Sequence, residues 1–291
     1  MPTLKEFNVK LTRLRSTRKM TKTMKLVSVN KLRRAQDAEK RVSLIANRMF
    51  GILGRMGPSV VAGEHPLVIP RKSVKNVLVL LISSDRGLCG GFNNNLIKMI
   101  NPWLKQQEGK GHSVSMSFCG RRGYASFKNR ATIERNYEDV MVKPDFSHAH
   151  RIARELQAAF IRGRVDEVYL AYNSLQGAMA YQPVVEKIIP MDPNALTQSG
   201  VDSKTGGGWM MEPNSEEVLN ALLPRVISLS VYIAMLSSSV GEHSARMKAM
   251  EQASSNADNL IRQITLQRNR ARQAAITTEL TEIVAGAEAL K

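Results

Sequence analysis

The residues best placed to do chemistry lie in the run Ser83-Ser-Asp-Arg-Gly-Leu-Cys-Gly-Gly91. This run follows a strand-like segment and precedes a helix-like one, which is where α/β folds bind phosphate groups. Its glycines match neither the G-x-G-x-x-G pattern nor the P-loop pattern, which ends in Lys-Ser/Thr. We therefore interpret the run as a structural turn with unusual φ angles, and nucleotide binding by an α/β enzyme stays as an alternative.

The cysteines and histidines offer little further chemistry. Cys89 and Cys119 are too few for a disulfide framework, so we interpret them as buried structural thiols in a reducing compartment, with a redox pair as the alternative. His148 and His150 stand two residues apart at the start of a predicted helix and would not face one metal ion together. No Ser–His–Asp or Cys–His spacing stands out. We expect no catalytic residue, no cofactor and no metal.

The middle of the chain alternates between strand and helix patterns, which predicts an α/β fold. Its last two strands are expected to pair across a loop at 173–180, and Ser147 is the expected N-cap of the third helix. No element is clear at 131–142, and 192–208 is expected to be a loop. Such alternation predicts a mostly parallel sheet with helices on its faces. The predicted strands are 77–83, 113–119, 167–172 and 182–189, and the predicted helices are 92–107, 121–127 and 147–162.

Two long helical patterns flank this middle part. The first covers residues 2–56 and the second begins at the capping sequence Asn214-Ser-Glu-Glu217. At ~1.5 Å per residue they would reach about 80 Å and about 110 Å, too long for a compact globule of this size. We expect an antiparallel coiled coil, with Pro224 kinking or breaking the second helix. The predicted domains are an N-terminal helix (1–58), a globular α/β domain (59–211) and a C-terminal helix (212–291).

The second helix is the longer one, so its last turns are expected to extend past the partner helix. These turns are again apolar, and an apolar helix end without a neighbour in its own chain needs a socket in another protein. The apolar residues are Leu280, Ile283, Val284, Ala287 and Leu290.

The net charge of +17 predicts a strongly acidic partner. A basic stripe on the first helix lacks interleaved aromatic residues, which favours an acidic protein surface over nucleic acid; a merely solvated face is the third possibility. We find no apolar window of 18 residues and no signal peptide, so no membrane span is expected. A mitochondrial transit peptide is disfavoured because the helical pattern runs unbroken past residue 50. The stripe comprises Arg13, Arg15, Arg18, Lys19, Lys22 and Lys25.

Several separated motifs carry a family resemblance. The C-terminal run has Ile276, Thr277, Glu279, Glu282, Gly286 and Ala287 at the spacing of the signature Ile/Val-Thr-x-Glu-x-x-Asp/Glu-x-x-x-Gly-Ala. Residues 242–250, 269–273, 21–24 and the turn at 83–91 fit the same family. Over its whole length the chain resembles the γ subunit of F-type ATP synthases.

The resemblance implies a coiled coil carrying a Rossmann-like α/β domain, acting as a non-catalytic rotor. The coiled coil would turn inside a ring of α and β subunits, and the globular domain, with the ε subunit, would stand on the c-ring. Proton or sodium flow would drive ATP synthesis at β, and the reverse drive would accompany hydrolysis. The implied contacts with α or β are Lys22, Met24, Lys25, Arg272, Gln273, Thr277 and Glu279.

The resemblance also implies a location. The chain would be a peripheral protein on the cytoplasmic face of a bacterial plasma membrane, attached indirectly through the c-ring. For a mature organellar chain the membrane would be an inner or thylakoid membrane. The loop at 192–208 has no cysteine pair, so the thiol switch of chloroplast relatives has no residues here.

Overall fold

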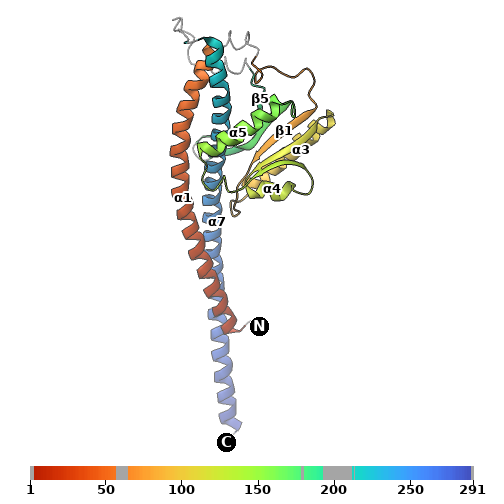
Figure 1. The fold of residues 1–291 in the computed structure, drawn as a ribbon. Helices are drawn as coiled ribbons and strands as arrows, with labels where there is room; N and C mark the ends of the chain where they lie inside the picture. The colour runs from red at the N-terminus through yellow and green to blue at the C-terminus, as the bar shows by residue number, and fades with distance from the viewer. Residues whose placement is uncertain (1–2, 57–64, 178–179, 193–211, 213, 290–291) are drawn as a thin grey trace. The chain divides into compact units, whose positions relative to one another are not determined.

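The computed structural model describes residues 3–56, 65–177, 180–192, 212 and 214–289. It divides into two units, which we describe one at a time. The helical unit combines residues 1–29 with 246–291, and the α/β unit comprises residues 30–245. Two long helices, α1 (Leu4–Arg55) and α7 (Ser215–Ala289), contribute residues to both units (Figure 1). Most of the expected loop at 192–208 lies outside the described residues.

The α/β unit is built on a five-stranded sheet in the order β3-β2-β1-β4-β5. The first four strands run parallel and β5 pairs antiparallel with β4, which confirms the mostly parallel sheet and the expected strand pair. β4 runs three residues into the segment expected to be loop. The strands are β1 (Asn76–Ile82), β2 (Ser113–Cys119), β3 (Thr132–Tyr137), β4 (Glu167–Leu175) and β5 (Tyr181–Ile189).

Helices cover the two faces of the sheet, as the alternating pattern predicts. On one side lie α3 (Phe92–Gly109) and α4 (Arg121–Phe127), and on the other lies α5 (Phe146–Ile161) (Figure 1). Strand β1 is buried on both faces because its side chains alternate between two apolar cores. Leu78, Leu80 and Ile82 pack with α5, α1 and α7, whereas Val77, Val79 and Leu81 pack with α3 and α4.

Helix α7 passes through Pro224 without the expected break. Asn214 caps the helix, because its Oδ1 accepts a hydrogen bond from the Glu217 backbone N–H at 2.8 Å. The Pro224 carbonyl accepts hydrogen bonds from Ser228 Oγ at 2.8 Å and Gln157 Nε2 at 3.0 Å. The carbonyl that loses its helical N–H donor to the proline is that of Asn220, which is exposed and therefore accessible to water, and the helix continues to Ala289.

Helix α7 is also long and apolar enough to cross a membrane by length and composition alone. Its best 18-residue window has a mean hydropathy of 1.7, so the expectation that no such window exists was wrong. Half of that window is buried, and a core helix of a water-soluble domain meets the same test. Leu223, Val226 and Ile227 of α7 are buried in the first core of the α/β unit, and this packing explains the apolar composition.

The N-cap of α5 is Asp145, and the expectation of Ser147 was wrong. Asp145 is extended, with φ −134° and ψ 151°, and its Oδ1 accepts a hydrogen bond from the Ser147 backbone N–H at 2.8 Å. The helix therefore begins at Phe146, and Ser147 lies within its first turn. This hydrogen bond from Ser147 holds the pKa of Asp145 below its ordinary value.

We expect Asp145→Ala to lower the melting temperature by about 3 °C at neutral pH, because the α5 N-terminus loses its cap. Ser147→Ala should lower it by less, because this change removes only the hydroxyl that also bonds Asp145 and keeps the backbone N–H that the cap accepts from. Because the pKa of Asp145 is lowered in the folded chain, the cap stabilises the folded chain at pH values above the unfolded-state pKa of this carboxyl. The difference between wild type and Asp145→Ala should therefore vanish as the pH falls through the folded-state pKa, as followed by circular dichroism. A difference that persists in acid would contradict this assignment.

Three tyrosine hydroxyls of the sheet donate to carboxylates. Tyr137 and Tyr169 donate to Glu155 and Glu167 at 2.7 Å, and Tyr172 donates to Glu186 at 3.1 Å. Burial, together with these neighbouring carboxylates, raises the pKa of all three phenols far above the ordinary value.

These raised pKa values predict a loss of stability in alkali. The unfolded chain releases the phenolic protons near pH 10, whereas the folded chain retains them, so stability should fall as the pH rises above about 10. Absorbance at 295 nm at pH 11 should show fewer tyrosinates in the folded chain than in the urea-denatured chain. Titration of all six tyrosines near pH 10 while circular dichroism remains native would contradict the prediction.

Candidate functional site

The turn after β1 is held together by its own polar groups. Asn93 accepts from the Ser84 backbone N–H at 3.1 Å and donates to Ser84 Oγ at 2.7 Å. Ser83 Oγ accepts from the Gly123 backbone N–H at 2.8 Å. Leu88 and Gly90 have positive φ angles of 62° and 57°, so the unusual backbone angles are confirmed. The Ser84 backbone N–H and the Ser83 and Ser84 hydroxyls are thus engaged within the turn, which favours the structural interpretation.

The two cysteines are free and buried, as expected for structural thiols. Burial raises the pKa of the Cys119 thiol well above its ordinary value, which disfavours the reactive thiolate. His150 lies within hydrogen-bonding distance of Ser228 Oγ, at 3.1 Å from Nδ1. Among the residues that the structure describes, no cluster of three His, Cys, Asp or Glu side chains is placed to hold a metal ion.

In the helical unit, α1 and α7 form an antiparallel coiled coil. Arg18 pairs with Asp258 at 2.8 Å, and Lys25 pairs with Glu251. Seven residues forward along α1 therefore correspond to seven residues backward along α7, as in an antiparallel pair. Between the helices lies a seam at heptad spacing. Exposed ion pairs contribute little to stability, so the seam holds the register. Its buried members are Leu11, Thr21 and Ser28 of α1 and Met250, Ala257 and Ile264 of α7.

Two of the expected contact residues line a basic groove of this coiled coil. The groove has a volume of about 840 Å³, and Lys22 and Lys25 line it together with Arg15, Arg18 and Lys19. Lys22 is exposed, whereas Lys25 and the neighbouring Met24 are half-buried. Two acids of α7, Glu251 and Asp258, face these cations and were not predicted from the sequence. They are seven residues apart, and this heptad separation is the sequence signal that places them on one edge of the helix.

The other expected contact residues, Arg272, Gln273, Thr277 and Glu279, are exposed on the last turns of α7. Extending the register of the two ion pairs places Leu4, the first residue of α1, opposite Arg272. The same register puts Lys22 opposite Ser254, about 27 Å along α7 from Arg272. The structure therefore separates the predicted site residues into two groups and does not bring them together.

Beyond Arg272, helix α7 presents apolar side chains to solvent. Ile276, Leu280, Ile283 and Val284 are 49%, 57%, 68% and 59% exposed, and Ala287 is exposed as well. We call these first four residues the apolar tip. Leu290 lies outside the described residues. Exposed apolar clusters of this kind mark surfaces that another molecule covers.

Threonine hydroxyls on the same turns are engaged within the helix. Thr277 donates to the Gln273 carbonyl at 3.0 Å, Thr278 to the Ala274 carbonyl at 3.0 Å and Thr281 to the Thr277 carbonyl at 2.8 Å. The segment therefore combines exposed methyl groups with hydroxyl donors that are already used.

The fold and these surfaces define a class of protein, in which an α/β domain is inserted between two helices that pair as a coiled coil. The family model described as ATP synthase matches residues 3–290. The ATP synthase gamma chains of Chlorobium chlorochromatii and Anaeromyxobacter sp. strain K are 41% and 40% identical to this chain. Each comparison covers the whole of this chain and 99% or 100% of the relative. The chain belongs to the ATP synthase gamma-chain family.

Solved structures agree on the fold. A chain of the Euglena gracilis mitochondrial ATP synthase is 19% identical, with a TM-score of 0.69 over 99% of this chain and 94% of that chain. A chain from the Tetrahymena thermophila mitochondrial ATP synthase, described as central stalk and c-ring, is 23% identical, with a TM-score of 0.57 over 81% of this chain and 99% of that chain. The expected fold, a coiled coil with a Rossmann-like α/β domain, is confirmed.

Proposed function

We propose that this chain is the non-catalytic central-stalk rotor of an F-type ATP synthase. It would couple ion-driven rotation of the c-ring to ATP synthesis and hydrolysis at the β subunits. The observation that carries the proposal is the apolar tip, which has no partner helix within the described chain. A rotor tip seated in a collar of α and β subunits accounts for exposed apolar residues at the end of a long helix, whereas the enzyme and nucleic-acid alternatives do not.

The coiled coil is the part of the chain that would transmit torque. Two helices with a shared heptad seam resist bending and twisting better than one helix, so torque applied to one part reaches the other. The division into an N-terminal helix (1–58), a globular domain (59–211) and a C-terminal helix (212–291) assigns the shaft to the helices. The globular domain is assigned to contacts with the ε subunit and the c-ring, and any membrane association is indirect, through the c-ring.

We assign contacts with α or β to both groups of expected site residues. Lys22 and Lys25 line the basic groove, with Met24 beside them, and Lys25 would exchange Glu251 for an acidic residue of β as the shaft turns. Such an exchange costs little, because Glu251 is 59% exposed and an exposed ion pair is worth about 1 kcal/mol or less. The second group would contact the collar around the tip. It comprises Arg272, Gln273, Thr277 and Glu279.

The test is purification of the tagged chain from its native membranes in mild detergent, read by mass spectrometry and ATPase activity. Recovery of α and β in stoichiometric amounts with ATPase activity is the expected result. Recovery of nucleic acid or unrelated proteins without ATPase would overturn the proposal. Tight ATP binding by the isolated chain would instead favour the nucleotide-binding enzyme.

The contact residues need their own test in the purified complex. Arg272→Gln should change the ATPase rate, because Arg272 is assigned to the collar. Arg262→Gln is the matched control, since Arg262 is also exposed on α7 but is not among the assigned contacts. Equal rates for the two variants would remove Arg272 from the contact set without affecting the rotor proposal.

A further inference from the structure

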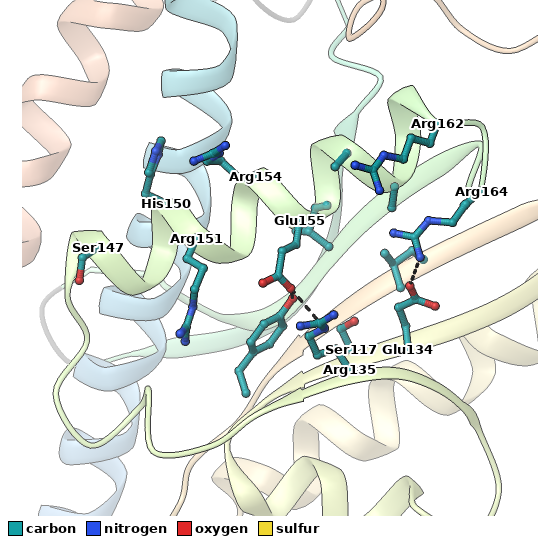
Figure 2. Close-up of a pocket in the computed structure, with 15 residues that line it drawn as sticks. Ser117, Glu134, Arg135, Ser147, His150, Arg151, Arg154, Glu155, Arg162 and Arg164 are labelled. Carbon is teal, nitrogen blue, oxygen red and sulfur yellow. Dashed lines mark hydrogen bonds and ion pairs between the residues drawn. The ribbon is translucent and has the colours of Figure 1, made fainter.

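A groove beside α5 in the α/β unit contains none of the residues that we assign to contacts with α or β. It has a volume of about 510 Å³ and is walled by α5 and by strands β2 and β3. Its lining is strongly basic, with five arginines against two glutamates (Figure 2). We call it the α5 groove. The arginines are Arg135, Arg151, Arg154, Arg162 and Arg164, and the acids are Glu134 and Glu155.

The acids of the α5 groove are both engaged. Arg164 pairs with Glu134 at 2.7 Å, and Arg135 pairs with Glu155 at 3.3 Å. Glu155 also accepts a hydrogen bond from Tyr137 OH at 2.7 Å. Within the part of the chain that the structure describes, the other three groove arginines, Arg151, Arg154 and Arg162, form no ion pair with an acidic side chain. Their guanidinium groups are therefore available to an anionic ligand.

Arg151 and Arg162 lie toward opposite ends of the groove. In Figure 2 Glu155 and Arg135 lie between Arg151 and Arg162, while Arg154 leaves α5 on the other side, near His150. Residues 151, 155, 158 and 162 follow helical spacing and share one face of α5. At ~1.5 Å per residue, Arg151 and Arg162 start about 16 Å apart along the helix axis.

The floor of the α5 groove is mixed, because β1 contributes the apolar Leu78 and β2 contributes the polar Ser117. Val114, Met116 and Phe118 face the core beneath α3 and α4, so the alternating residues Ser115 and Ser117 face the α5 side. The edge strand β3 adds Arg135 and Tyr137 next to them. Apart from Leu78, Leu156 and two alanines the lining consists of polar, aromatic hydroxyl and charged residues, which favours an extended acidic chain over an apolar helix.

The length of the groove selects among anionic ligands. A single phosphate is too small to reach both arginines. An extended peptide, at about 3.3 Å per residue, covers about 16 Å with five residues, and its first, third and fifth side chains share one face. Acidic residues at the first and fifth positions would meet Arg151 and Arg162, and an uncharged polar residue at the third would meet the neutralised central cluster.

We propose that the α5 groove binds an extended acidic segment of a partner protein, with two Asp or Glu residues four positions apart. Arg151 and Arg162 bind the two carboxylates through charge-assisted hydrogen bonds. The proposal depends only on the α/β unit, so it stands or falls separately from the rotor assignment.

A peptide titration against the full chain tests the arginines. The probe is the fluorescein-labelled peptide Ser-Asp-Ser-Gln-Ser-Asp-Ser, and the readout is fluorescence anisotropy. The double variant Arg151→Gln and Arg162→Gln should weaken binding by about tenfold or more, because two charge-assisted contacts are lost. Arg122→Gln is the matched control and should bind like wild type, because Arg122 is exposed on α4 at the other face of the sheet and does not line the α5 groove. A probe with Asn in place of both Asp residues should also bind at least about tenfold more weakly.

Two results would overturn the proposal in this titration. One is equal affinity of the double glutamine variant and wild type. The other is displacement of the probe by inorganic phosphate at the concentration at which the unlabelled peptide displaces it, which would indicate a small-anion site. Arg151 and Arg162 are exposed, so the variants should melt like wild type. If they do not, Arg151→Lys with Arg162→Lys keeps both charges and should retain most of the binding.

Photo-cross-linking in the complex from native membranes tests the partner itself. Ser147 lies exposed at the rim of the α5 groove and can be replaced by p-benzoylphenylalanine. The cross-linked segment should belong to another protein and should carry two acids four positions apart. Absence of a cross-link, or a cross-link to a segment without such acids, contradicts the proposal.

Discussion

Replacing Gly120 with alanine is expected to destabilise the α/β unit by about 3 kcal/mol or more. Gly120 has a φ of +100°, and an added Cβ would lie 2.3 Å from the Ser83 carbonyl oxygen and 2.7 Å from its carbonyl carbon. Those atoms cannot move aside easily, because the Ser83 backbone N–H donates to the Cys119 carbonyl at 2.8 Å and holds β1 against β2. Urea denaturation of the full chain measures the effect.

Two other glycines separate the causes of that loss. Gly163 also has a positive φ, +70°, but nothing lies within 4 Å of the position that an added Cβ would take, so Gly163→Ala should cost only about 1 kcal/mol of backbone strain. Gly109 ends α3 with open space and no positive φ, so Gly109→Ala should be neutral or slightly stabilising. Equal losses for Gly120→Ala and Gly163→Ala would show that the clash with Ser83 does not matter.

Changing all four residues of the apolar tip to serine is expected to weaken assembly with α and β by on the order of 3 kcal/mol, or about 100-fold in Kd. The substitutions are Ile276→Ser, Leu280→Ser, Ile283→Ser and Val284→Ser. Each side chain is about half exposed or more in the chain alone, so the free energy of unfolding should change by about 0.5 kcal/mol or less per substitution. Titration of the labelled chain with purified α and β subunits measures the affinity.

The control for this prediction is a matched set of exposed apolar residues in the α/β unit. Leu44, Ile45, Leu88 and Ile161 are 66%, 54%, 63% and 53% exposed. Changing these four to serine removes comparable apolar area away from the tip and should leave the Kd for α and β unchanged. If both quadruple variants weaken assembly equally, the tip has no special role in the collar.

Much of the fold could be predicted because local pattern and tertiary environment agree. Strand β1 is a continuous apolar run that feeds two cores, and both ends of β2 and of α4 fall where the pattern places them. Strand β3 was missed because Thr132–Tyr137 is an edge strand whose polar side chains are mostly exposed. The position of this edge strand is set by backbone pairing with β2, and such pairing produces no alternation of apolar and polar residues in the sequence.

The candidate sites show the same limit. The basic stripe and the apolar tip could be predicted because each lies on one helix, where spacing along the chain determines the shared face. The acids that pair with Arg18 and Lys25 lie more than 200 residues away in the chain, so only the coiled-coil register brings them together. The α5 groove depends on the position of β3 beside β2, which places Arg135 against Glu155.

The hydroxyls of Thr277, Thr278 and Thr281 bear on how smoothly a shaft can turn. Each donates its proton to a carbonyl of its own helix, although all three residues are exposed. A hydroxyl proton that faced a surrounding subunit would form and break a hydrogen bond of about 1 kcal/mol as the shaft turned. The energy of the shaft would then rise and fall with its rotation angle. For the proposed rotor, internal donation flattens that profile, so less of each turn is dissipated as friction.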